Sequence, residues 1–126
     1  FLDKLTFRFR SPARGEIIAF RSPAGEDHES VKRVIGLPGD TVELRHKKVY
    51  LGGEPQFEPY AYYARAGEAL QGDDLGPFTV PRDSLFVLGD NRDNSNDSAS
   101  WKDPATGLPP GFLPAENVTG KVRGAY

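Results

Sequence analysis

The sequence of 126 residues contains no cysteine, no methionine, one tryptophan and only two histidines. Two isolated histidines without cysteine leave little material for a zinc site. Basic and acidic residues nearly balance, 16 against 18, which argues against general nucleic-acid binding because such proteins carry a basic footprint. No stretch reaches the roughly 18 consecutive apolar residues of a membrane-spanning helix. The composition therefore gives no support to a zinc protein, a nucleic-acid-binding protein or a membrane-spanning chain.

Glycine and proline, in contrast, are frequent, with 14 and 11 residues. So many glycine and proline residues make long helices unexpected, because both residue types interrupt helices. Strand-like runs recur between turn residues at 5–9, 16–20, 31–36, 41–45, 48–52, 78–80, 84–89 and 117–123. This spacing favours a single all-β domain, with only a short helical turn expected from Pro114 to Asn117.

Residues 53–76, named the cap segment here, differ from the rest of the chain. They are rich in proline and tyrosine and show no helical period. We expect them to form a small inserted cap between two parts of one core, residues 1–52 and 77–126. The tyrosines of this segment fit either a recognition surface or packing against a sheet edge.

A strand-like stretch places Lys32 and Arg33 among the apolar residues Val31, Val34 and Ile35. Because side chains alternate along a strand, Lys32 shares a face with Val34, and Arg33 lies on the other face. A lysine titrates near 10.4 in water, and burial in an apolar pocket favours its neutral form, which is a base. A lysine in a strand is also commonly a solvated edge residue. This stretch alone leaves both readings open.

A second feature is the polar run GDNRDNSNDS at residues 89–98, directly after the apolar run at 85–88. Asn, Asp, Ser and Gly are ordinary turn formers, so a hydrogen-bonded surface loop is one interpretation. An EF-hand calcium loop fails on spacing, since a loop starting at Asp93 requires Gly where Ser98 stands and Glu where Pro104 stands. A calcium site of another kind stays open.

Taken together, KRVIGLPGD at residues 32–40 and GDNRDNSNDS at 89–98 resemble the type I signal peptidase (leader peptidase) family of bacteria and organelles. RGEIIAF at 14–20 and LPAENVTGKV at 113–122 are similar to further segments of that family. The resemblance covers most of the chain outside residues 53–76. It implies a coiled, partly barrel-like antiparallel β fold.

The resemblance also implies a serine endopeptidase that uses a Ser/Lys dyad, needs no cofactor and removes signal peptides from exported proteins. Such enzymes act on the extracytoplasmic side of a bacterial or thylakoid membrane. Lys32 matches the family's general base, and Ser95 matches the hydroxyl that orients this lysine. Arg33 and Asp90 match a supporting ion pair beside the site.

Three residues that precede the base, Glu29, Ser30 and Val31, match the strand that contacts the substrate. Val31 is expected to line a small apolar pocket that accepts small side chains such as alanine. Asp97 matches a further acid of the family, whose usual arginine partner two residues later is replaced here by Ala99. We therefore expect Asp97 either to cap the loop through backbone donors or to pair with a cation from elsewhere.

The family's nucleophilic serine lies in a Ser-Met-x-Pro box that follows a membrane anchor. Neither feature has a counterpart in residues 1–126. The resemblance thus predicts a fragment that carries the lysine half of the site and does not cleave peptides alone. Its partners are expected to be signal peptides and, through the missing anchor, the membrane surface. In a longer chain, Lys32→Ala is expected to abolish cleavage and Lys47→Ala is not.

Two alternatives accompany the signal peptidase interpretation. One is a self-cleaving repressor-type domain, which also uses Ser/Lys chemistry on a related β fold. The other is a non-catalytic β module that binds protein or calcium. Neither His28 nor His46 is placed by the sequence beside a serine and an acid, so a Ser-His-Asp site has no support.

Overall fold

The computed structural model describes residues 1–23 and 29–123, which form ten strands and two 3-10 helices. The strands are β1 (Leu2–Asp3), β2 (Ile17–Arg21), β3 (Glu29–Gly36), β4 (Thr41–Arg45), β5 (Lys48–Leu51), β6 (Glu54–Pro55), β7 (Leu75–Thr79), β8 (Ser84–Leu88), β9 (Leu113–Pro114) and β10 (Val118–Val122). The helices are η1 (Thr6–Arg8) and η2 (Ala115–Asn117).

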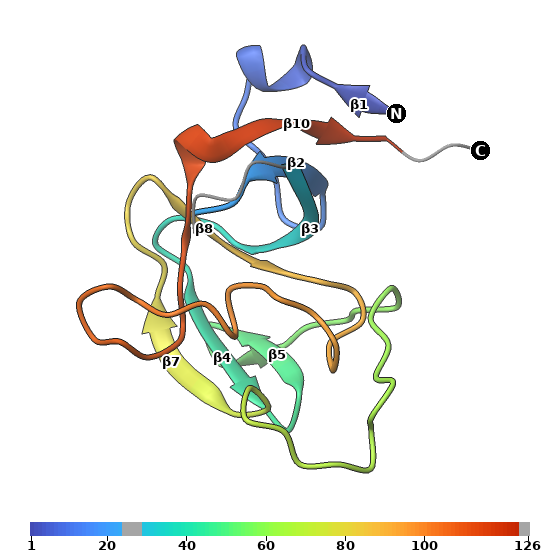
Figure 1. The fold of residues 1–126 in the computed structure, drawn as a ribbon, viewed down its shortest axis with the longest axis vertical. Coiled ribbons are helices and arrows are strands. Elements are labelled where there is room, and N and C mark those ends of the chain that lie inside the picture. The colour runs from blue at the N-terminus through green and yellow to red at the C-terminus, as the bar shows by residue number, and fades with distance from the viewer. Residues whose placement is uncertain (24–28, 124–126) are drawn as a thin grey trace.

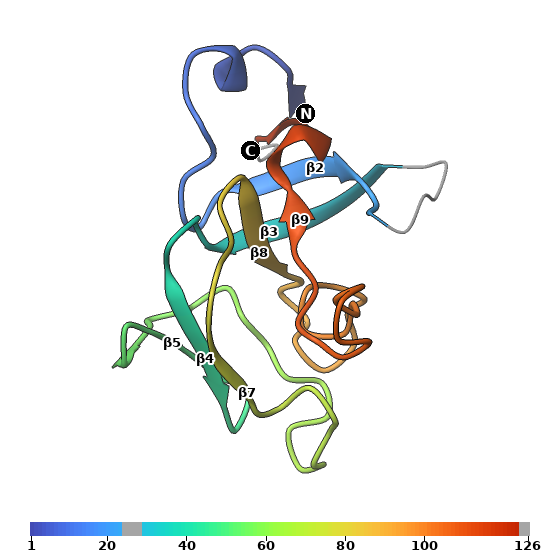
Figure 2. The same cartoon turned by 90° about the vertical axis from the view of Figure 1, so that its left-hand side faces the viewer.

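The strands form two sheets, one above the other in Figure 1. The upper sheet has six strands in the order β1-β10-β2-β3-β8-β9, and the lower sheet has four in the order β6-β5-β4-β7. The chain passes between the sheets from β3 to β4 and returns from β7 to β8 (Figure 2). All pairings between the named strands are antiparallel. The predicted all-β antiparallel fold is confirmed.

Strand β8 separates two apolar cores because its side chains alternate between them. The first cluster consists of Ile18, Phe20, Val34, Leu85, Val87 and Leu113, and the second of Ile35, Val42, Leu44, Val49, Val80, Phe86 and Leu88. A strand buried on both faces is apolar at every position, which explains the continuous run at 85–88. Strand β3 divides its residues in the same way, with Val34 in the first cluster and Ile35 in the second.

The strand predicted at residues 5–9 is wrong, because the chain there forms the helix η1. The Asp3 carboxylate accepts hydrogen bonds from the backbone N–H groups of Leu5 at 2.8 Å and Thr6 at 3.1 Å. An aspartate that binds the backbone two and three residues later closes a turn and competes with strand pairing. The short helical turn expected near Pro114 is confirmed as η2.

Candidate active site

Lys32 and Ser95 meet where β3 lies beside the loop that follows β8, although 63 residues separate them in the sequence. Strand β3 places Lys32 on the face of the buried Val34, and Ser95 lies in residues 89–98, named the site loop here. Lys32 Nζ donates a hydrogen bond to Ser95 Oγ at 2.9 Å, and both residues are half-buried. An amine held against a hydroxyl by a hydrogen bond has the geometry that proton transfer between them requires.

Gly89 makes this contact possible because it has no side chain. A Cβ atom at Gly89 would lie 2.2 Å from Ser95 Oγ and 3.5 Å from Lys32 Nζ. The space that a side chain would fill is thus taken by the Ser95 hydroxyl. The sequence marks Gly89 as a member of the polar run but gives no sign of this close approach.

Arg33, on the opposite face of β3, pairs with Asp90 of the site loop. Its Nε and one terminal nitrogen donate hydrogen bonds to the two carboxylate oxygens of Asp90 at 2.9 and 2.8 Å. The other terminal nitrogen donates to the Gly15 carbonyl at 2.7 Å. The Tyr60 ring centroid lies 3.8 Å from the guanidinium carbon. Arg33 thereby ties the start of the site loop to the chain before β2 and to the cap segment.

The second half of the site loop is held in place by two buried side chains, of which one binds within the loop and one binds β8. Asp97, which is 3 % exposed, accepts hydrogen bonds from the N–H groups of Gly89 at 2.9 Å and Ala99 at 3.0 Å. Burial raises the pKa of Asp97, while its hydrogen bonds from Gly89, Ser95 and Ala99 act in the opposite direction. Ser98 Oγ accepts a hydrogen bond from Val87 N–H at 3.0 Å. Asp97 therefore caps the loop through backbone donors.

The strand expected to contact substrate has one open edge beside Lys32. Strand β2 pairs with β3 along Glu29, Ser30 and Val31, whereas β8 pairs with the other edge only from Arg33 onward. That other edge has no strand partner among the residues that the structure describes. Val31 is 51 % exposed, and the Glu29 carboxylate contacts the Thr119 hydroxyl. An extended peptide could pair with this open edge.

Two buried contacts of the site loop are not evident from the sequence. The first joins Arg92 to Glu58 of the cap segment by two hydrogen bonds of 2.8 Å each. The side chains of Arg92 and Glu58 are 5 % and 7 % exposed. Both residue types are ordinary on a surface, and 34 residues separate them, so no local pattern predicts their pairing.

The second contact joins Lys47, in the turn between β4 and β5, to two acids. Its Nζ lies 2.7 Å from Asp93 and 3.1 Å from Asp73, and the Lys47 side chain is 12 % exposed. Although burial acts to raise the pKa of Asp93, hydrogen bonds from Lys47 and from Arg65 N–H hold it below its usual value. Lys47 therefore helps to hold the site loop, and Lys47→Ala is not a neutral control for Lys32→Ala.

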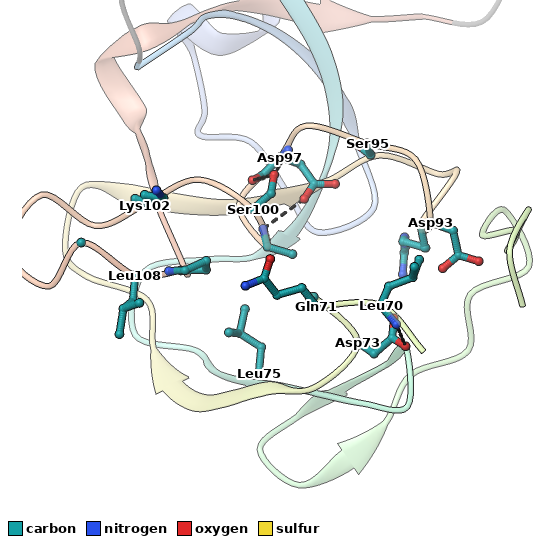
Figure 3. Close-up of a pocket in the computed structure, with 15 residues that line it drawn as sticks. Leu70, Gln71, Asp73, Leu75, Asp93, Ser95, Asp97, Ser100, Lys102 and Leu108 are labelled. Carbon is teal, nitrogen blue, oxygen red and sulfur yellow. Dashed lines mark hydrogen bonds between the residues drawn. The ribbon is translucent and has the colours of Figure 1, made fainter. Parts of the chain in front are cut away.

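A cavity of about 430 Å³ borders the site loop. Figure 3 shows Ser95 and Asp97 along one wall, with Leu70 and Leu75 across from them and Leu108 at another side. Lys32 does not line this cavity. The site loop is thus not packed against an apolar core along this side, and its order depends on its polar contacts.

Among residues 1–23 and 29–123, no helix combines the length and apolar character needed to cross a membrane. Within the same residues, no three His, Asp or Glu side chains gather where they could hold a metal ion. His46 is exposed in the turn between β4 and β5. His28 lies outside the described residues.

Comparison with known proteins agrees with the resemblance carried by residues 32–40 and 89–98. A family model described as "Signal peptidase, peptidase S26" matches residues 1–126. The probable signal peptidase I-2 of Synechocystis sp. is 38 % identical over 126 residues, which cover 96 % of this chain and 51 % of that protein. Signal peptidase I of Leptolyngbya laminosa is 35 % identical over 128 residues, which cover 96 % of this chain and 56 % of that protein.

A solved structure gives the same result for the fold. The crystal structure of a signal peptidase I from Enterococcus faecalis V583 matches with a TM-score of 0.67 and 34 % identity. The match covers 90 % of this chain and 98 % of that one. Fold and sequence together place the chain in a class of proteins that are peptidases. The chain belongs to the signal peptidase family, peptidase S26, and it spans about half the length of the curated relatives it matches.

Proposed function

We propose that this chain is the lysine-bearing part of a serine endopeptidase that removes signal peptides from exported proteins. Lys32 is the general base, and Ser95 holds its amine in place. The observation that carries this proposal is the hydrogen bond of 2.9 Å between Lys32 Nζ and Ser95 Oγ. It supports a base because a flexible lysine stem needs a fixed partner to be aimed. Arg33, Asp90 and Asp97 support the loop that carries Ser95.

In the proposed reaction, the neutral Lys32 amine takes the proton of a serine hydroxyl as the oxygen attacks the peptide carbonyl. The resulting ammonium then gives this proton to the departing amine, so that an acyl-enzyme and a shortened polypeptide are formed. Water, activated by the same amine, releases the acyl group. The attacking serine is expected in a Ser-Met-x-Pro box, which has no counterpart in residues 1–126.

The substrate is proposed to bind as an extended strand along the open edge of β3. Backbone hydrogen bonds to residues 29–31 supply the grip, and the exposed Val31 limits the size of the substrate side chain beside it. Small residues near the cleavage point, such as alanine, fit such a shallow pocket. Preproteins with these residues would meet the enzyme on the extracytoplasmic side of a bacterial or thylakoid membrane.

Cleavage of a preprotein by the protein at its natural length tests the proposal. Lys32→Ala is expected to lower kcat/KM by about 10²–10⁴-fold, which is the usual contribution of a general base. Lys4→Ala is the matched control, because Lys4 is exposed and follows β1, at the edge of the upper sheet opposite β8 and β9. Equal turnover of the Lys32→Ala variant and the unsubstituted protein would refute the assignment.

The substrate strand has a separate test in Val31→Phe. A phenylalanine would fill the shallow pocket, so cleavage after alanine is expected to fall while the free energy of unfolding stays nearly unchanged, since Val31 is half exposed. Unchanged cleavage after alanine would remove Val31 from the pocket.

A further inference from the structure

Three residues of the cap segment contact the site loop or Arg33, which is bound to that loop. Glu58 binds Arg92 through both carboxylate oxygens. The Tyr60 ring lies against the guanidinium of Arg33, which itself binds Asp90. Tyr62 N–H donates a hydrogen bond to the Asp90 carbonyl at 2.9 Å.

Tyr62 also completes a backbone ladder with the site loop. Its carbonyl accepts a hydrogen bond from Arg92 N–H at 3.0 Å, and together with the bond to Asp90 this forms a parallel bridge to Asn91. Residues 58–61 form a turn, closed by a hydrogen bond of 3.2 Å from Ala61 N–H to the Glu58 carbonyl. This turn brings Glu58 and Tyr62 to the first half of the site loop.

Arg92 connects the cap segment to the backbone beside the Lys32–Ser95 pair. Besides its two bonds to Glu58, its Nε donates a hydrogen bond to the Gly89 carbonyl at 2.9 Å. Gly89 is the residue whose missing side chain leaves room for the Ser95 hydroxyl. A continuous set of polar contacts thus runs from Glu58 through Arg92 to the backbone that borders Ser95.

This buried pair is better suited to orientation than to stability. A buried ion pair adds little net stability compared with apolar residues of the same size, because both charges lose their hydration. A guanidinium held at both ends by planar hydrogen bonds, however, fixes direction as well as distance. The site loop needs such a constraint because a cavity of about 430 Å³ lies beside Ser95.

We infer that Glu58, acting through Arg92 and the Gly89 carbonyl, is a positioning residue that holds Ser95 against Lys32. The cap segment is then part of the construction of the active site rather than a separate recognition surface. The catalytic consequence of this role rests on the proposed function. The geometric claim, that Glu58 and Arg92 hold Ser95 against Lys32, does not depend on the proposed function.

The test compares Glu58→Gln with Glu68→Gln in the chain of 126 residues. Glu68 is a matched control because it belongs to the same segment and pairs with an arginine, Arg65, but both of these side chains are at least half exposed. Side-chain NMR of Lys32 and amide NMR of Ser95 report the contact, and the amides of β2 and β10 report the fold. Arg92→Lys, which keeps the charge but not the planar hold, is the second variant.

The expected result is a shift of the Lys32 and Ser95 resonances in Glu58→Gln and Arg92→Lys, with β2 and β10 unshifted and Glu68→Gln like the unsubstituted chain. In the protein at its natural length, kcat should fall about 10–100-fold with KM little changed, as for a small misplacement of reacting groups. Unshifted Lys32 and Ser95 resonances in a folded Glu58→Gln chain would overturn the inference. Global unfolding of both variants would also overturn it, because the pair would then support the whole fold.

Failure of the proposed function gives a different pattern. If the unsubstituted protein at its natural length does not cleave a preprotein, the peptidase assignment fails. The NMR comparison would still decide whether Glu58 positions Ser95.

Discussion

Two long irregular loops follow one another in this chain, and they are held in different ways. The site loop takes its partners from distant parts of the fold, including Arg33, Lys47 and Glu58. Residues 102–110, named the distal loop here, are held largely by their own backbone. Asp103 N–H donates to the Leu108 carbonyl at 2.9 Å, and Gly107 N–H donates to the Asp103 carbonyl at 2.7 Å.

This difference shows how a polar loop can be ordered so that it forms part of a functional site. A loop closed by its own turns keeps its shape locally, but its side chains stay exposed, as Leu108 does at 65 %. A loop held from outside can bury polar groups, as the site loop does with Asp93, which binds Lys47. Substitutions of outside partners should therefore disturb the site loop more than matched substitutions disturb the distal loop.

Lys47→Ala is expected to have the largest effect. It leaves the carboxylates of Asp73 and Asp93 without their shared cation, and removal of one partner from an enclosed ion pair is strongly destabilising. Lys102→Ala in the distal loop should change stability by less than about 0.5 kcal/mol, because Lys102 is exposed. Denaturant unfolding of both variants measures the contrast, and equal losses would end the distinction between the loops.

Gly89→Ala is expected to come next. The added methyl group overlaps Ser95, so a cost of about 1–3 kcal/mol is expected, together with loss of the contact between Lys32 and Ser95. Gly107→Ala in the distal loop has open space but a φ of +71°, and should cost about 1 kcal/mol through backbone strain alone. Unfolding experiments and side-chain NMR of Lys32 separate the two. An intact Lys32 resonance in Gly89→Ala would contradict the close approach.

Much of this fold was predictable because its strands follow local rules. The apolar run at 85–88 and the alternation around Lys32 are visible in sequence, and the structure places both as expected. The strand predicted at 5–9 failed because one side chain, Asp3, binds the backbone just after it. The partners of Arg92 and Lys47 could not be predicted, since pairing of distant charges depends on how the sheets bring them together.

Asp103→Ala should have a smaller effect. Its carboxylate accepts a hydrogen bond from Ala105 N–H at 2.8 Å in an exposed turn, so its removal should cost about 1 kcal/mol. Asp97→Ala removes the acceptor of the partly buried N–H groups of Gly89 and Ala99, which should cost about 1–3 kcal/mol in all. Amide hydrogen exchange should show faster opening around residues 103–108 in the first variant and around 89–99 in the second. Faster exchange around residues 89–99 in Asp103→Ala, or around 103–108 in Asp97→Ala, would contradict the view that each aspartate stabilises its own loop.

The pH dependence of stability should reveal the smallest differences. The pKa of Asp93 is lowered on folding, so its contribution is present above pH 3.8 and is lost as the pH falls through the folded value. The pKa of Asp97 is raised, so its contribution is full below pH 3.8 and declines as the pH rises. Asp93→Asn should therefore cost more at pH 6 than at pH 3, and Asp97→Asn should cost less. Unfolding free energies at both values check the signs, and parallel trends for the two variants would rule out this account.

A crystal structure of the chain at neutral pH tests the central claim most directly, namely that β3 and the site loop bring Lys32 and Ser95 together. The account predicts a separation of about 2.7–3.2 Å between Lys32 Nζ and Ser95 Oγ, with Arg92 bound to both Glu58 and the Gly89 carbonyl. A Lys32 amine directed into solvent, with Ser95 turned toward the cavity, would contradict it.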